Sequence, residues 1–234
     1  MANGSAGAPR WVEVSPERLG SWLDTFARRH SGMKATQPAP AIVTFRAADG
    51  AVARCHVPFP PLPESLLAGL APGGPAETAQ QAADVISAHA RSPRTVGVLL
   101  VRLGGYAAGV FTGPDARLAE SKVGSRLVHG RSAAGGTSQQ RFARRREKQA
   151  AEALGAAADT AAEVFGRFTG GLDAVVLGGD RRAIAGMRDD PRLKPYFGLA
   201  VERFLTVPDP RLAVLRGAPR LFRAVRIQLT DGAG

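Results

Sequence analysis

The chain of 234 residues is 44% hydrophobic and carries 31 lysines and arginines against 20 acidic residues, a net charge of +11. The hydrophobic content predicts a folded core and excludes wholesale disorder, and the positive charge predicts a polyanionic partner. The most apolar stretch, Val96–Leu103, is far shorter than the roughly 20 residues that span a membrane. One cysteine and four scattered histidines offer neither a disulfide nor a metal-ligand pair, so we expect no metal or cofactor. Residues 1–10 lack the apolar core of an export signal, so we expect a cytoplasmic protein.

The first part of the chain, residues 1–92, predicts a small α/β lobe without recognisable chemistry. A cap residue, a first-turn proline and an acid at positions 15–17 are typical of a helix start, and Asp49-Gly50 is typical of a hairpin turn. The expected elements are a helix from Ser15, a flexible stretch Ser31–Pro40, a β-hairpin of Ile42–Phe45 and Val52–Val57, a proline-rich connector 58–75, and a helix to about Ala90.

The remainder, residues 93–234, predicts an α/β domain with a mixed sheet. Three meandering strands are followed by helices that alternate with strands, the order typical of such domains. We expect the strands at Val96–Leu103, Tyr106–Thr112, Arg117–Val128, Leu172–Leu177, Phe204–Val207 and Phe222–Leu229, the last closing the sheet. We expect the helices at Gln139–Phe168, Asp180–Met187 and Arg211–Leu215, with an apolar stripe of Ala151, Leu154, Ala158, Ala161, Phe165 and Phe168 on the first of them.

Most of the net charge is concentrated between residues 121 and 150. A solvated helix face normally mixes charges of both signs, whereas this segment has eight basic residues and one acid, Glu147. Arginine pairs with phosphate through two hydrogen bonds, so the segment predicts RNA or phosphate binding. The basic residues are Lys122, Arg126, Arg131, Arg141, Arg144, Arg145, Arg146 and Lys148.

Inside this basic segment, a glycine-rich loop joins a strand to the long helix. Its sequence from His129 to Gln140 is HGRSAAGGTSQQ. The phosphate-binding motif of nucleotide hydrolases requires lysine where Gly136 stands, and a metal-dependent nuclease would need carboxylates that Val96–Leu103 lacks. Glycine lets a backbone approach its ligand, and glutamine positions water by hydrogen bonding. His129 is equally compatible with an RNA contact and with a structural hydrogen bond.

The loop and helix resemble those of eukaryotic and archaeal class I peptide-chain release factors, which carry a His-Gly-Arg-Gly-Gly-Gln-Ser run leading into Arg-Phe-x-Arg-x-Arg. The resemblance extends over about Arg94–Leu229. In that register Thr137 replaces the release factors' glutamine, and three extra residues precede Gly135. The arrangement Gly136-Thr137-Ser138-Gln139 instead resembles the Vms-type release-factor-like branch, which has an actinobacterial version.

The resemblance implies a ribonuclease-H-like fold and a peptidyl-tRNA hydrolase that acts on stalled large ribosomal subunits. It implies Gln139 as the critical side chain, with Gln140 as the alternative, and a loop completed by Gly135, Gly136, Thr137 and Ser138. Expected partners are the large subunit, its ribosomal RNA and peptidyl-tRNA, with a monomer off the ribosome. Cleavage of the tRNA near its 3′ end and a purely binding role remain alternatives. The expected RNA contacts are His129, Arg131, Arg141, Arg144, Arg145, Arg146 and Lys148.

Overall fold

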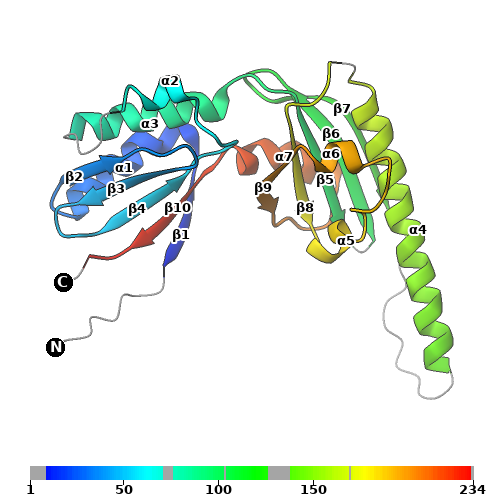
Figure 1. Cartoon of the computed structure of the whole chain (residues 1–234). Helices are drawn as coiled ribbons and strands as arrows, with labels where there is room; N and C mark the ends of the chain where they lie inside the picture. Colours follow the sequence, from blue (N-terminus) through cyan, green and yellow to red (C-terminus); the bar gives the residue numbers. More distant parts are fainter. Residues whose placement is uncertain (1–8, 71–75, 103, 126–137, 169, 233–234) are drawn as a thin grey trace. The chain divides into compact units, whose positions relative to one another are not determined.

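The structure, a computed structural model, describes residues 9–70, 76–102, 104–125, 138–168 and 170–232. For residues 76 and 138–146 it describes the backbone and not the side chains. The chain divides into two compact units (Figure 1). The first unit combines residues 1–92 with the C-terminal segment 223–234, and the second consists of residues 93–222. Each unit has a five-stranded sheet and a hydrophobic core of its own.

The first unit is built on an antiparallel sheet with the strand order β1-β10-β4-β3-β2. Helices α1 and α3 lie together on one side of this sheet (Figure 1), and their apolar faces share a core with the strands. The strands are β1 (Arg10–Val14), β2 (Met33–Gln37), β3 (Ile42–Ala47), β4 (Val52–His56) and β10 (Val225–Thr230). The helices are the 3-10 turn η1 (Pro16–Arg18), α1 (Leu19–Arg29), α2 (Glu64–Leu67) and α3 (Ala76–Arg91).

The predicted hairpin is confirmed: β3 and β4 pair around a turn in which Gly50 has φ of 89°, a conformation that favours glycine. The stretch Ser31–Pro40, expected to be flexible, instead contains the edge strand β2, so that expectation was wrong. Strand β1 was not predicted at all. Both strands are short and lie at the two edges of the sheet. Strand β1 pairs with the distant β10, whereas β2 pairs with β3, the next strand along the chain.

The second unit has a mixed sheet with the order β7-β6-β5-β8-β9, which confirms the predicted α/β class. Strands β5 to β7 form an antiparallel meander, and β8 and β9 run parallel to β5. The strands are β5 (Val96–Arg102), β6 (Gly105–Thr112), β7 (Arg117–Ser125), β8 (Ala174–Gly179) and β9 (Ala200–Leu205). The helices are α4 (Ser138–Gly166), α5 (Arg181–Ala185), α6 (Lys194–Phe197) and α7 (Leu212–Phe222).

Helices cover both faces of this sheet. Ala157, Ala161 and Phe165 of α4 share one core with β5, β6 and β8. Helix α7 contacts the other side, where the ring of Phe222 meets that of Phe111 edge-on at 5.9 Å. Among the described residues, no helix combines the length and the apolar character needed to cross a bilayer.

The last strand does not belong where the sequence placed it. We expected Phe222–Leu229 to close the sheet of the second domain, but β10 pairs with β1 and β4 in the first unit. Its residues are alternately buried and half-buried, as a strand with one open face requires, whereas β5 and β8 are buried almost throughout. The placement of residues 223–234 in the second domain was therefore wrong.

Candidate functional site

The candidate loop lies between the end of β7 at Ser125 and the start of α4 at Ser138. Five of the predicted site residues fall outside the described residues: His129, Arg131, Gly135, Gly136 and Thr137. The structure places the backbone of the others in the first three turns of α4: Ser138, Gln139, Gln140, Arg141, Arg144, Arg145, Arg146 and Lys148. Glutamine and arginine residues expected to act together thus share one helix, whose start the sequence predicted to within one residue.

Helix α4 consists of a part that packs on the sheet and a part that extends beyond it (Figure 1). Full burial begins at Ala157, while Glu147, Lys148 and Ala151 are exposed. The predicted apolar stripe is therefore confirmed at Ala158, Ala161 and Phe165 and wrong at Ala151. We refer to residues 138–149 as the arm; at 1.5 Å per residue it is about 18 Å long. An arm of this kind can carry the residues at its tip into a recess that the rest of the domain cannot enter.

Ion pairs tie β7 to the packed part of α4. The Nζ atom of Lys122 lies 2.5 Å from Oε2 of Glu163, and Arg167 pairs with Glu163 at 2.8 Å and with Glu120 at 3.0 Å. The hydrogen bond from Lys122 is the main reason that the pKa of Glu163 lies below its ordinary value. Lys122 is thus neutralised locally, and the basic cluster inferred from sequence is smaller by this residue.

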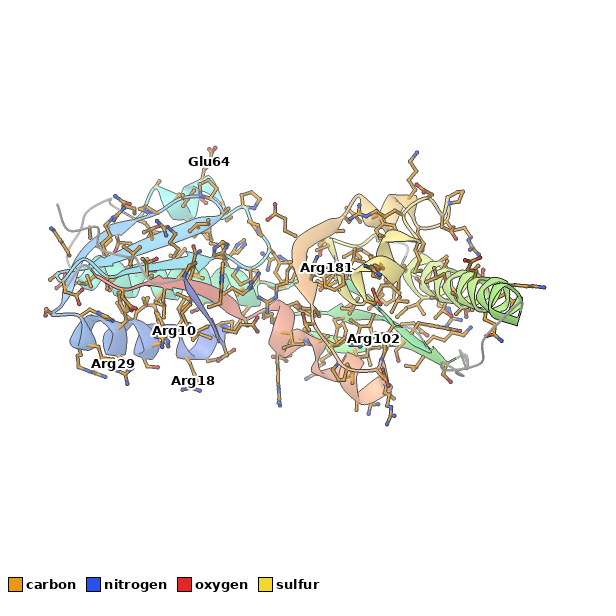
Figure 2. All side chains as sticks on the ribbon, turned by 90° about the horizontal axis from the view of Figure 1, so that it is seen from below. Arg10, Arg18, Arg29, Glu64, Arg102 and Arg181 are labelled. Carbon is orange, nitrogen blue, oxygen red and sulfur yellow. The ribbon has the colours of Figure 1, made fainter. Side chains whose placement is uncertain are left out.

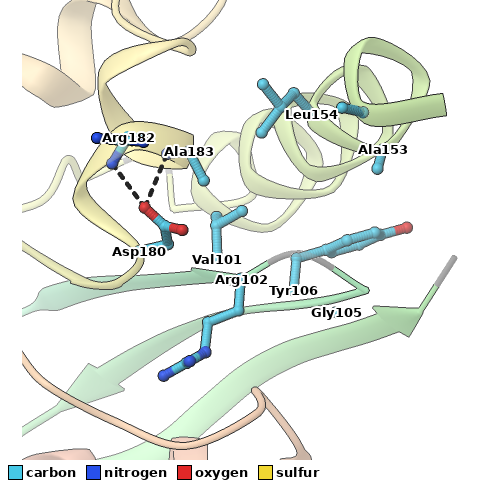
Figure 3. A pocket seen from close by; sticks show the side chains of 10 residues that line it. Val101, Arg102, Gly105, Tyr106, Ala153, Leu154, Asp180, Arg182 and Ala183 are labelled. Carbon is cyan, nitrogen blue, oxygen red and sulfur yellow. Dashed lines mark hydrogen bonds between the residues drawn. The ribbon is translucent and has the colours of Figure 1, made fainter. Parts of the chain in front are cut away.

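A cavity of about 250 Å³ opens at the root of the arm (Figure 3). Leu154 and the ring of Tyr106 provide apolar walls, and Asp180 faces the space from the end of β8. The Nη1 atom of Arg102 donates to the carbonyl oxygen of Val207 at 2.8 Å, so its guanidinium group is committed to the β9–α7 connection. Sequence reasoning missed this pocket because its walls come from three segments distant in the chain: Val101–Tyr106, Ala150–Leu154 and Asp180–Ala183.

The end of β8 is held tightly against β5. The backbone N–H of Asp180 donates to the carbonyl oxygen of Val101 at 2.7 Å, and the Asp180 carboxylate accepts the N–H of Arg182 at 2.7 Å as the cap of α5. Gly179 has φ of 98°, and a Cβ atom there would overlap Val101. Only glycine fits this position, and it fixes the geometry from which the pocket and the root of the arm are built.

The described residues bring no metal-type cluster together: none of their His, Cys, Asp and Glu side chains form a group of three or more that could hold an ion. They supply instead a rigid base, a projecting helix with arginine residues on its first turns, and the two ends of a glycine-rich loop. Such an arrangement can position groups by hydrogen bonding and charge.

Residues 94–228 match the protein family described as "Actinobacteria/chloroflexi VLRF1 release factor". The chain belongs to this family. The matched range includes the loop, the whole of α4 and most of β10. The resemblance to the Vms-type release-factor-like branch, inferred from the loop sequence, is thereby confirmed. No curated protein matches the chain.

Three solved structures show a weak likeness. An archaeal translation termination factor, aRF1, is 12% identical with a TM-score of 0.40, and the likeness covers 91% of this chain and 64% of that one. The "Vms1 mitochondrial localization core" is 13% identical with a TM-score of 0.30, covering 78% and 71%. A structure titled "Archaeal protein" is 14% identical with a TM-score of 0.30, covering 94% and 68%. The chain thus spans less than two thirds of the archaeal termination factor, and likenesses at this level carry no conclusion about function.

Membership of a release factor family supports a role at the ribosome, in translation termination or rescue. It is consistent with the basic character of the chain and with the arginines of the arm.

Proposed function

We propose that this protein is a peptidyl-tRNA hydrolase that releases nascent chains from tRNA on stalled large ribosomal subunits. The observation that carries the proposal is the family match, because it spans the loop with Gly135, Gly136 and Gln139 and the arm that continues from it. A release factor must reach a peptidyl ester enclosed within the subunit. A helix that projects about 18 Å beyond its packed base is a suitable carrier.

In the proposed reaction, a water molecule attacks the carbonyl carbon of the ester that joins the peptide to the terminal ribose of tRNA. The carbon–oxygen bond to the ribose breaks, the ribose oxygen takes a proton, and the peptide leaves as a free acid. Gln139 and backbone N–H groups of residues 135–138 orient the water and stabilise the carbonyl oxygen as it gains charge. Glutamine is no strong base, so its contribution is orientation rather than proton abstraction. Gln140 is the alternative for the same role.

The arm provides affinity in this proposal. Arg131, together with the arginines of the first turns of α4 and Lys148, contacts phosphates of ribosomal RNA and of the tRNA acceptor end, and His129 lies among them. The exposed position of Lys148 is compatible with such a contact. These partners would place the protein in the cytoplasm, as a monomer when it is not bound to the subunit.

The products of one reaction test the proposal. Purified protein is added to large subunits that carry a labelled peptidyl-tRNA, and both peptide and tRNA are followed. Free peptide with intact tRNA supports the proposal. A tRNA shortened at its 3′ end would replace it with a nuclease activity, and unchanged peptidyl-tRNA on subunits that bind the protein would leave a purely binding role.

A further inference from the structure

The sheet of the first unit has a second face, opposite to α1 and α3. Side chains alternate along a strand. Val43, Phe45, Cys55 and Ile227 belong to the core beneath the helices, so their neighbours in the strands point to the other face. Strand pairing aligns these neighbours in rows: Trp11, Gln228, Arg54, Thr44 and Gln37 form one row across all five strands.

Three arginines cross this face on a diagonal. Arg226 of β10 lies opposite His56 of β4. Arg54 lies two residues from His56 on β4. Arg46 of β3 lies opposite Val52, which is two residues beyond Arg54 on β4. Each step crosses one strand and advances two residues, which is about 8 Å. Among the described strand residues that point to this face, Glu13 is the only acid, and strand pairing sets it opposite Arg226. Arg54 and Arg46 have no acid opposite them in the neighbouring strands, so the track keeps an excess of positive charge.

An aromatic side chain stands at one end of the track. The ring of Trp11 lies 5.1 Å from that of His56, and the guanidinium carbon of Arg226 is 4.5 Å from its centre. These contacts hold the indole in place, yet Trp11 remains 44% exposed, the highest value among the exposed large hydrophobic side chains of the described residues. A fixed and exposed tryptophan beside arginines is a surface on which a flat, uncharged ring can stack.

We propose that this face binds single-stranded RNA. Unpaired bases stack on exposed aromatic rings while arginines follow the phosphates, and polar side chains such as Gln228 and Thr44 lie between the two where base edges would come. The charge of the arginines alone would attract RNA and an acidic protein surface alike. Trp11 favours RNA, because it adds a ring on which bases can stack. The site is distinct from the arm, and it gives residues 1–92 and the strand β10 a common role in holding RNA.

The chain offers a site-specific probe, because it contains two tryptophans, Trp11 and Trp22. Trp22 lies in α1, stacked on Phe26 with ring centres 5.7 Å apart. In full-length protein with Trp22→Phe, fluorescence reports Trp11 alone, while Trp11→Phe leaves a reporter on the helical side. An oligouridine of about ten nucleotides, labelled for anisotropy, measures total binding in the same samples. Total binding includes RNA on the arm; Trp11 emission does not.

We expect oligouridine to quench Trp11 in a saturable manner and to leave Trp22 unchanged. Arg54→Gln and Arg46→Gln should each weaken the quenching and lower its salt slope by about 0.7. Arg29→Gln removes the same charge from α1, where Arg29 points away from the strands (Figure 2), and should have no effect. A double-stranded RNA of equal length should quench weakly.

Bound oligouridine without quenching of Trp11 would place the RNA elsewhere and overturn the proposal. If Arg29→Gln weakens the quenching as much as Arg54→Gln does, the RNA is attracted by overall charge and not by this face. If duplex RNA quenches Trp11 at the same concentration, the face has no preference for single strands. A face that binds an acidic protein and no RNA would be a protein surface instead. None of these outcomes depends on peptide release, which tests the proposed function separately.

Discussion

Lys122 Nζ and Glu163 Oε2 are 2.5 Å apart, and this pair joins the strand that leads into the candidate loop to the helix that leaves it. Both side chains are about half exposed, so the pair adds little to overall stability. Its effect is local: together with Arg167, it fixes β7 against the packed part of α4, from which the arm projects.

The pair should make stability depend on pH in a defined direction. The pKa of Glu163 is lowered in the folded protein, mainly by the hydrogen bond from Lys122. Its contribution is therefore present above the unfolded value of about 4.3 and lost as pH falls through the lower folded value. Glu163→Gln should lower Tm slightly at pH 7, and the difference from wild type should shrink as pH falls below the ordinary glutamate value. Glu152→Gln, at an exposed position of the same helix, should show no such difference at either pH.

Two lysines near the loop should differ in their effect on ribosome binding. Lys122 is neutralised by Glu163, whereas Lys148 is exposed and has no ion-pair partner among the described residues. Lys148→Gln should reduce the salt slope of large-subunit binding by about one, since one counterion fewer is released. Lys122→Gln removes the same charge and should leave the slope unchanged. Equal effects of the two substitutions would mean that the ion pair opens on the ribosome.

Two glycines of the second unit should respond to alanine in opposite directions. Gly179 has φ of 98°, and a Cβ atom would overlap Val101, so Gly179→Ala should cost at least about 2 kcal/mol. Gly155 lies inside α4 with open space around it, so Gly155→Ala should stabilise the protein by about 0.5–1 kcal/mol. Chemical denaturation of both variants measures this, and a neutral Gly179→Ala would contradict the tight junction between β5 and β8.

Cys55 should contribute packing and no chemistry. It is fully buried in the core of the first unit, and burial raises the pKa of its thiol far above neutrality. Cys55→Ser places a hydroxyl there and should cost about 1–3 kcal/mol, with Cys55→Ala costing less. Peptide release by folded protein should be unchanged in both. Loss of release in a folded Cys55→Ala variant would point to thiol chemistry and away from the loop.

The sequence predicted those elements whose signal is local. The apolar runs of β5 and β6, the hairpin turn at Asp49-Gly50 and the long helix α4 were all found because propensity and packing agree there. The edge strands β1 and β2 were missed, since each has only five residues, and the neighbour of β1 is β10 at the other end of the chain.

Strand β10 was assigned to the wrong sheet, although its own sequence has a distinct pattern. Its sequence alternates apolar and polar residues from Val225 to Thr230, which is the pattern of an antiparallel strand with one open face. The central strands β5 and β8 of the second sheet are apolar almost throughout, so the pattern of β10 does not fit a central place between them. The outer strands β7 and β9 do contain charged residues, so pattern alone leaves the sheet of β10 open. For the candidate site, the sequence predicted the start of α4 to within one residue, while the loop before it lies outside the described residues and stays a prediction. The pocket at Tyr106 and Asp180 could not be predicted, because its walls come from segments distant in the chain.

Gln139 is the residue that we propose to orient the attacking water. Gln139→Ala should lower the rate of peptide release at least about a hundredfold, because the side chain that holds the attacking water is gone. Binding to the large subunit should stay within about twofold of wild type, since the arginines of the arm and Lys148 still contact phosphates. Gln140→Ala, the neighbouring substitution of the same size, should reduce release much less.

Thr137→Ala is the informative comparison, because Thr137 stands where class I release factors carry their glutamine. If the side chain of Gln139 does the positioning, Thr137→Ala should release peptide at nearly the wild-type rate. Equal damage from Thr137→Ala and Gln139→Ala would mean that the loop acts through its backbone, since both substitutions alter its shape and only one removes an amide. A wild-type rate in Gln139→Ala would exclude this residue, and a loss confined to Gln140→Ala would move the proposed role by one position along the first turn of α4.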